Sequence, residues 1–194
     1  MRGKPTTAVT LLALALALGA GGASAQGRPD PAALMKAQRE ALAPLVKLDG
    51  VWRGPATTVT PAGTHSITQT ERIGPFLDGS VKVLEGRGYD ADGKVTFNAF
   101  GTISFNPATK AYTMHSHAMG NVGDFALTVT ADGFSWELPA GPATIRYTTS
   151  IKDGVWHEVG DRIVTGKDPQ RFFEMTLKRV GDTDWPAAGA IAPK

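Results

Sequence analysis

The chain has 194 residues, no cysteine and a formal net charge of +2. Without cysteine it cannot form disulfides, thiolate metal sites, a cysteine nucleophile or a lipid anchor at cysteine. The small net charge and the lack of a lysine- or arginine-rich run argue against binding to nucleic acid or to an anionic membrane, because both require a basic excess.

The first 25 residues have the pattern of a signal peptide. Two basic residues precede an apolar run over 8–20, which small residues follow up to position 25. We therefore predict cleavage between Ala25 and Gln26 and a periplasmic or secreted protein. The alternative, a membrane anchor, is disfavoured because the run is shorter than the roughly 20 residues that span a bilayer. No second run of this kind follows, so we expect a soluble mature chain without a transmembrane segment.

Residues 26–48 are predicted to form a leader and one amphipathic helix. Asp30 and Pro31 supply an N-cap and the residue best tolerated at the first helical position. Apolar residues then recur at intervals of three or four up to Leu45, with charged residues between them. Pro44 should interrupt this helix, so we expect a break there and a short turn through Leu48.

From Val51 onward apolar and polar residues alternate, as in strands that bury one face. Turn signals rich in glycine, proline, asparagine and aspartate separate these stretches, which predicts about ten short antiparallel strands over 49–181. A sheet this long closes most simply into an all-β, up-and-down barrel, because closure removes the exposed edges. The tail over 182–194 is expected to lie on the surface, with Trp185 docked along it.

The segment 45–54 resembles the opening of a known group of barrels. It places Gly50-Val51-Trp52 at the start of the first strand, directly after a short helical stretch. This arrangement resembles the calycin superfamily, to which lipocalins and fatty-acid-binding proteins belong. The resemblance implies that Trp52 plugs the closed end of the barrel and that Arg179, on the last strand, stacks on its ring.

Over roughly 45–180 the chain is also similar to exported bacterial proteins of the family called domain of unknown function 1579. The similarity lies in the Leu-x-x-Leu-x-Gly-x-Trp-x-Gly opening, the segment 73–79 and the turn Gly88-Tyr89-Asp90. It supports the barrel prediction and implies no established activity.

His115 and His117 are candidates for metal chemistry. Residues two apart on a strand point the same way, so the pair can supply half of a zinc or copper site. The remaining ligands would have to converge in space from His65 and His157 or from Glu71 and Glu85. The simpler interpretation is a polar feature on the outer face or at the barrel mouth, so we predict no metal and no other cofactor. No residue favours a haem-binding variant.

Glu71 shares a face with Ile67 and Ile73, whereas the residues between them are polar. This face is therefore predicted to point inward, and Arg87 on the following strand is predicted to do the same. An inward carboxylate needs a partner, because an unpaired buried charge is costly, and Arg87 or Arg179 would supply one. The alternative is a structural ion pair that simply fills the barrel.

We predict a ligand site inside the barrel, an apolar pocket with a few convergent polar groups. Its predicted polar residues are Glu71, Arg87 and Tyr147, and its predicted apolar wall consists of Phe125, Trp136, Phe173 and Met175. On the strand near 155–159, two alternatives stay open: either His157 faces inward or Trp156 and Glu158 do.

We expect non-catalytic binding of a small, apolar or amphipathic molecule in the barrel. No Gly-x-Ser-x-Gly elbow, phosphate-binding glycine loop or dinucleotide fingerprint occurs in the sequence. One alternative is an enzyme in which Glu71 or a histidine acts as a general base. Another is an envelope interaction protein that uses the helix over 31–43 as its contact element.

Overall fold

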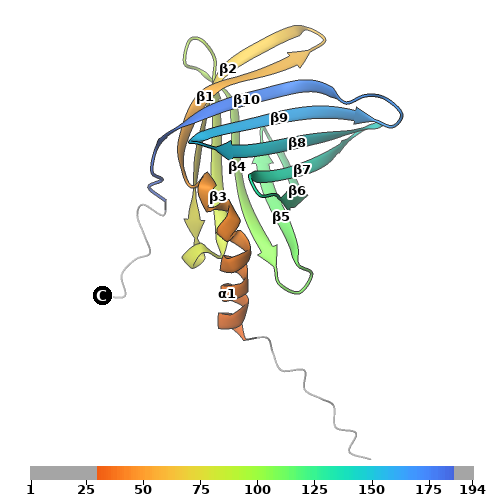
Figure 1. Cartoon of the computed structure of the whole chain (residues 1–194). Helices are drawn as coiled ribbons and strands as arrows, with labels where there is room; N and C mark the ends of the chain where they lie inside the picture. The colour runs from red at the N-terminus through yellow and green to blue at the C-terminus, as the bar shows by residue number, and fades with distance from the viewer. Residues whose placement is uncertain (1–29, 186–194) are drawn as a thin grey trace, which may run out of the picture.

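The computed structural model describes residues 30–185, which form a sheet of ten strands preceded by two helical segments and interrupted by a third (Figure 1). The helical segments are α1 (Pro31–Leu42), η1 (Ala43–Leu48) and, between the second and third strands, η2 (Leu77–Gly79). The strands are β1 (Gly50–Thr60), β2 (Gly63–Phe76), β3 (Val81–Tyr89), β4 (Val95–Asn106), β5 (Ala111–Ala118), β6 (Asn121–Val129), β7 (Gly133–Ala140), β8 (Ala143–Lys152), β9 (Val155–Val164) and β10 (Gln170–Gly181). The predicted signal peptide and its cleavage position lie outside the described residues.

Helix α1 begins and ends where its sequence requires. The Asp30 side chain accepts a hydrogen bond from the Ala32 backbone N–H at 3.0 Å, and Pro31 occupies the first turn. The α-helical part ends at Leu42, and the chain continues as the 3-10 helix η1, in which Pro44 lies in the first turn. The predicted break and the short turn through Leu48 are therefore confirmed.

The ten strands form a closed barrel in which every strand is antiparallel to both neighbours. Strands adjacent in sequence pair with each other, and β10 returns to pair with β1 through Trp52 opposite Arg179 and Ala56 opposite Met175. The predicted all-β, up-and-down barrel with an N-terminal helix is confirmed. Closure leaves neither β1 nor β10 as a free edge of the sheet.

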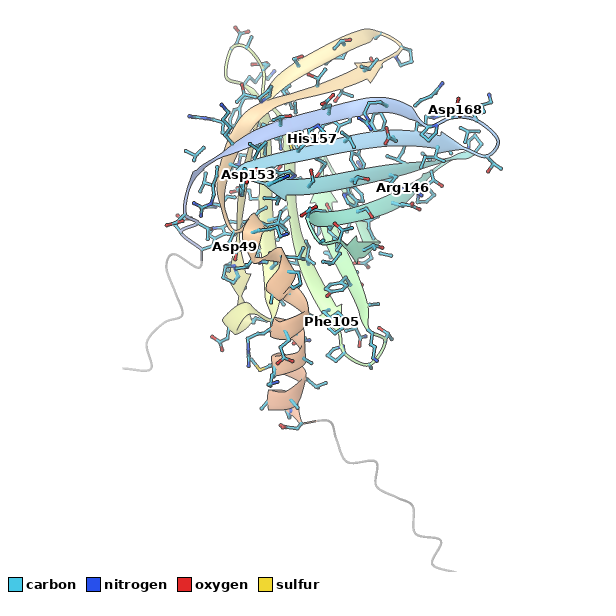
Figure 2. The ribbon with its side chains drawn as sticks, in the orientation of Figure 1. Asp49, Phe105, Arg146, Asp153, His157 and Asp168 are labelled. Carbon is cyan, nitrogen blue, oxygen red and sulfur yellow. The ribbon has the colours of Figure 1, made fainter. Side chains whose placement is uncertain are left out.

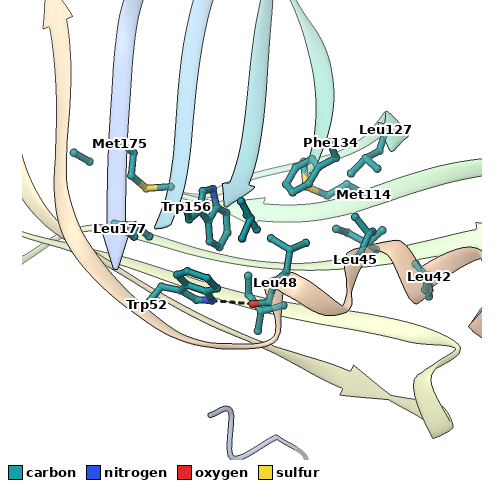
Figure 3. Packing of buried hydrophobic residues seen from close by; sticks show 14 residues of the cluster. Leu42, Leu45, Leu48, Trp52, Met114, Leu127, Phe134, Trp156, Met175 and Leu177 are labelled. Carbon is teal, nitrogen blue, oxygen red and sulfur yellow. Dashed lines mark hydrogen bonds between the residues drawn. The ribbon is translucent and has the colours of Figure 1, made fainter. Parts of the chain in front are cut away.

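One end of the barrel is filled by a hydrophobic core that the helical segments complete (Figure 3). Leu45 and Leu48 of η1 are fully buried there. Trp52 meets Trp156 edge to face, with ring centroids 5.9 Å apart, and its indole N–H donates to the Leu48 carbonyl at 2.8 Å. This hydrogen bond joins η1 to the inner wall, so the helical segments close the barrel end next to Trp52.

The described part of the tail docks on the outside of the barrel at β2. Trp185 packs edge to face on Phe76, with ring centroids 5.9 Å apart. The Arg72 guanidinium lies 4.2 Å from the Trp185 ring centroid, in a cation–π contact. A side chain at Gly74 would collide with Trp185 Cβ at 2.9 Å, so the glycine permits this close approach.

Candidate functional site in the barrel interior

Two carboxyl groups lie inside the barrel. Glu71 of β2 pairs with Gly86 of β3, and a Cβ at Gly86 would lie only 2.7 Å from Glu71 Oε1. Glu158 of β9 pairs with Thr149 of β8. Gln69 Nε2 donates to Glu71 Oε1 at 2.7 Å, and Thr149 Oγ1 donates to Glu158 Oε2 at 2.5 Å. Within residues 30–185 neither carboxylate forms an ion pair, so both lack a positive partner.

This environment favours the protonated carboxyls. The pKa of Glu71 is raised from its usual value to about 8, chiefly by burial and also by the negative charges of Glu158 and Glu85, whereas the hydrogen bond from Gln69 opposes this rise. Burial likewise raises the pKa of Glu158. At neutral pH the interior therefore holds a carboxyl group that donates or accepts a proton readily.

Two further polar groups lie beside Glu158. Burial and the negative charge of Glu158 raise the pKa of Tyr147 to about 12, so the phenol keeps its proton. The second group is the indole N–H of Trp156, which is on the same face of β9 as Glu158. In the described chain that buried N–H has no acceptor at hydrogen-bond geometry. The site thus offers an indole donor that no protein atom satisfies.

An aromatic wall continues from Tyr147 around the barrel. Trp136 stacks on Tyr147 with centroids 4.5 Å apart and planes 13° from parallel, and Phe125 contacts Trp136 at 5.1 Å. On the other side Phe173 and Phe172 contact Tyr147 at 5.7 and 6.0 Å. The structure therefore brings the predicted wall residues together, and Met175 joins them as part of the buried core.

The side chains that face the interior differ in exposure. The inward side chains of the core are buried, whereas those of Glu71, Glu158, Phe125, Trp136 and Tyr147 keep part of their surface exposed. Strands β6 and β7 pair only between 127–129 and 134–136, which leaves the wall beside Phe125 and Trp136 without a continuous ladder. Glu71 is opposite Trp52 in the β1–β2 register, so the partly exposed interior residues include one beside the covered end.

A groove lies where β1 and β10 stop pairing. Their last paired residues are Thr58 and Phe173. A groove of about 310 Å³ lies there, with Val59, Arg171 and Phe172 among its lining residues. Phe172 and Phe173 thus belong both to this groove and to the aromatic wall around Tyr147.

Arg87 does not belong to the interior, and its predicted inward orientation is wrong. Because Glu71 faces Gly86, the inward positions of β3 are the even-numbered ones, and Arg87 lies outside. There it donates to Glu85 at 2.6 Å, and Glu85 also accepts from Arg72 at 2.9 Å. The prediction failed because the outward residues of β3 include valines, whereas the inward ones include glycines and Lys82, which reverses the usual polarity of a strand.

Trp52 is buried at the covered barrel end, but Arg179 does not stack on it. Arg179 is opposite Trp52 in register, yet its guanidinium donates to the Asp49 carbonyl and to Asp182. In the part of the chain that the structure describes, the cation–π contact is that of Arg72 with Trp185. The nearby buried cation is Lys82, which forms an ion pair with Asp49.

In the described chain no histidine hydrogen-bonds to the interior carboxyls. His115 and His117 are on the outer face of β5, and His157, labelled in Figure 2, is on the outer face of β9, where it contacts Glu174 at 2.9 Å. His65 is exposed on β2 near the turn to β1. Within residues 30–185 no group of three or more histidine, aspartate or glutamate side chains is arranged to hold a metal ion.

Glu158 is the main functional candidate that sequence reasoning left undecided. The short turn Asp153-Gly154 sets Lys152 opposite Val155, which places Trp156 opposite Ile151 and Glu158 opposite Thr149. Both central residues of this turn have positive φ, as a two-residue hairpin of this kind requires. Counting back from this turn would have placed Glu158 and Tyr147 on the same face.

The closed antiparallel barrel with its plugged end places the chain among known folds. It has the fold of Rv2717c from M. tuberculosis, a protein whose crystal structure it matches with a TM-score of 0.54. The match covers 72% of this chain and 96% of Rv2717c at 14% sequence identity, so the likeness concerns the fold alone. No family model and no curated protein matches the sequence. The resemblance to the domain of unknown function 1579 family therefore stays a prediction.

No helix in the described range is both long and apolar enough to cross a bilayer.

Proposed function

We propose that this protein binds a small amphipathic molecule in the accessible part of its barrel, without catalysis. The observation that carries the proposal is the pair of interior carboxyls, Glu71 and Glu158, which form no ion pair in the described chain and of which Glu158 lies beside Tyr147 of the aromatic wall. A ligand with an apolar body would pack against the aromatic wall. Its polar, hydrogen-bond-donating head would give the two carboxyls the partner that the described chain does not provide.

The apolar body accounts for most of the binding free energy in this proposal. Burying about 150 Å² of apolar ligand surface against Phe125, Trp136 and Phe173 is worth roughly 4 kcal/mol at about 25 cal/mol per Å². Phe125, Trp136 and Phe173 are each partly exposed, so part of their surface is available to such a ligand.

The polar head is best supplied by a protonated amine. A positive charge beside Glu71 would stabilise its carboxylate and lower its raised pKa, so Glu71 would release a proton as the ligand binds. The faces of Trp136 and Tyr147 also favour a cation. An anionic head would instead lie beside two carboxyl groups.

Competition among three ligands with the same tail tests this proposal. Dodecylamine, dodecanol and dodecanoate would displace a neutral fluorescent naphthylamine dye from the delipidated protein. We expect saturable displacement by all three, with the amine at least about tenfold tighter than the carboxylate. Glu71→Gln with Glu158→Gln should remove that preference, whereas the matched change Glu137→Gln on the outer face should preserve it. A lack of saturable displacement by every ligand contradicts binding, and equal affinities contradict the role of the carboxyls.

One observation favours a second candidate function, general acid–base catalysis. A carboxyl whose pKa lies at about 8 can exchange a proton near neutral pH. Mass spectrometry of molecules co-purified with the protein would compare wild type with Glu71→Gln. Catalysis predicts that only the wild type converts its bound molecule during incubation, and an unchanged molecule in both proteins supports binding alone.

We infer that the protein is exported. The pattern over the first 25 residues supports this inference. Mass spectrometry of the protein from a periplasmic fraction should give a chain that begins at Gln26. An intact chain beginning at Met1 in the cytoplasmic fraction would contradict it.

A further inference from the structure

The outer face of β5 brings two imidazoles together at a distance suited to a metal ion. His115 Nε2 and His117 Nε2 lie 3.1 Å apart, with ring centroids separated by 4.9 Å and planes at 73°. Two nitrogens that each lie about 2.0–2.1 Å from one ion are separated by about 3 Å in tetrahedral or square-planar coordination. The two ring nitrogens therefore need little movement to bind the same ion.

Asp124 sets the orientation of this pair. Its carboxylate lies 2.7 Å from His115 Nδ1, across the β5–β6 ladder in which the two residues are paired. When Nδ1 donates its proton to the carboxylate, the Nε2 lone pair of His115 is directed to His117. A carboxylate that holds the far nitrogen of an imidazole is the usual support for a metal ligand.

A methionine lines the same groove as one histidine of the pair. Met119 follows His117 by two positions and is 60% exposed. His117 and Met119 line the same groove of about 370 Å³, together with Asn98 and Asn121. Met119 has a φ of 49°, a conformation that a residue with a long side chain seldom adopts. Met119 thus brings a thioether, a soft potential ligand, to the groove that His117 also lines.

We propose that His115, His117 and Met119 form a copper site on the outer face of the barrel, with Asp124 as a positioning residue. Imidazole and thioether together suit Cu(I), and the two imidazoles alone suit Cu(II), which binds nitrogen ligands more tightly than other divalent ions of the first transition row. Zinc is less suited, because its sites use thiolate, imidazole and carboxylate ligands and the third residue here is a thioether. The ion would replace the proton that the two Nε2 atoms share.

Metal titration of the untagged, full mature chain tests this proposal. Cu(II) binding would be followed by electron paramagnetic resonance, and Cu(I) binding by competition with bicinchoninic acid. We expect one ion of each per chain, with nitrogen hyperfine structure in the Cu(II) spectrum. His117→Asn should weaken both forms at least about tenfold, and Asp124→Ala should weaken them by roughly the same factor. Met119→Leu should weaken Cu(I) at least about tenfold and leave Cu(II) within about threefold.

His157→Asn is the matched control, because His157 is also an outer-face histidine with a carboxylate partner. It should leave both affinities unchanged. The double variant His115→Asn, His117→Asn measures copper bound elsewhere on the chain. Wild-type affinity in this double variant overturns the site, and unchanged Cu(I) affinity in Met119→Leu overturns the thioether ligand. Circular dichroism of each variant separates loss of binding from loss of fold.

Discussion

Gly86 of β3 faces Glu71 of β2, and the Glu71 carboxyl occupies the space where any other residue at 86 would carry its Cβ. That Cβ would be 2.7 Å from Glu71 Oε1 and 3.1 Å from the carboxyl carbon. The glycine therefore determines where the interior carboxyl lies, although its own contribution to the site is only the absence of a side chain.

Gly86→Ala should displace the Glu71 carboxyl and destabilise the fold by about 1–3 kcal/mol, a typical cost of overpacking. In a Glu71→Ala background the same change should cost much less, because the colliding atoms are gone. Urea unfolding of the four proteins gives the coupling free energy. Additive costs would show that the two residues do not share this space.

The stability of the protein should fall as pH rises. The pKa of Glu71 is about 8 in the folded protein and 4.5 in the unfolded chain. Between these two pH values the folded protein keeps a proton that the unfolded chain releases. The contribution of Glu71 to the free energy of unfolding is fully present below pH 4.5. It decreases as the pH rises from 4.5 to about 8. The expected fall in unfolding free energy is on the order of a few kcal/mol. Glu158, whose pKa is also raised, adds to it.

Glu71→Gln should flatten much of this dependence, because the amide cannot ionise. It should raise stability at pH 8.5 and change it little at pH 5, as measured by urea unfolding at both pH values. Glu137→Gln, on the outer face, should leave the slope as it is. A wild-type slope in Glu71→Gln would assign the dependence to other groups.

Trp52→Ala should destabilise the fold by about 3–5 kcal/mol, as expected for a large buried aromatic side chain. It removes the contact with Trp156 and the hydrogen bond to Leu48 that attaches η1. Thermal and urea unfolding measure the cost. Val46→Ala, in the same 3-10 helix but with a side chain 64% exposed, is the control and should change stability by less than about 0.5 kcal/mol.

Lys82→Met should destabilise the protein by about 3–5 kcal/mol, because it leaves the Asp49 carboxylate without its partner. Burial already raises the pKa of Asp49, and the positive charge of Lys82 opposes that rise. Adding Asp49→Asn should recover much of the loss, since no unpaired charge then remains. Urea unfolding at pH 7 compares the single and double variants, and a double variant no more stable than Lys82→Met would contradict this explanation.

Several features of the site were predictable from local sequence. Ile67, Glu71 and Ile73 follow an alternation that points them inward, and the structure has them there. The turn Asp153-Gly154 fixes the β8–β9 register, so the inward orientation of Glu158 was also present in the sequence. Arg87 was misplaced because its strand has valines outside and glycines inside, and hydrophobic alternation then indicates the wrong face.

The sequence by itself determined which segments are helix and which are strand, where α1 breaks and that consecutive hairpins close into a barrel. These features follow from turn residues and from the alternation of apolar and polar residues, and both patterns extend over only a few residues. Only the tertiary structure decided that Glu71 and Glu158 share the interior without a basic partner and that Arg179 serves Asp49 and Asp182 instead of Trp52. Such relationships depend on the register of strands far apart in the chain and on what covers each barrel end, and no local pattern records either.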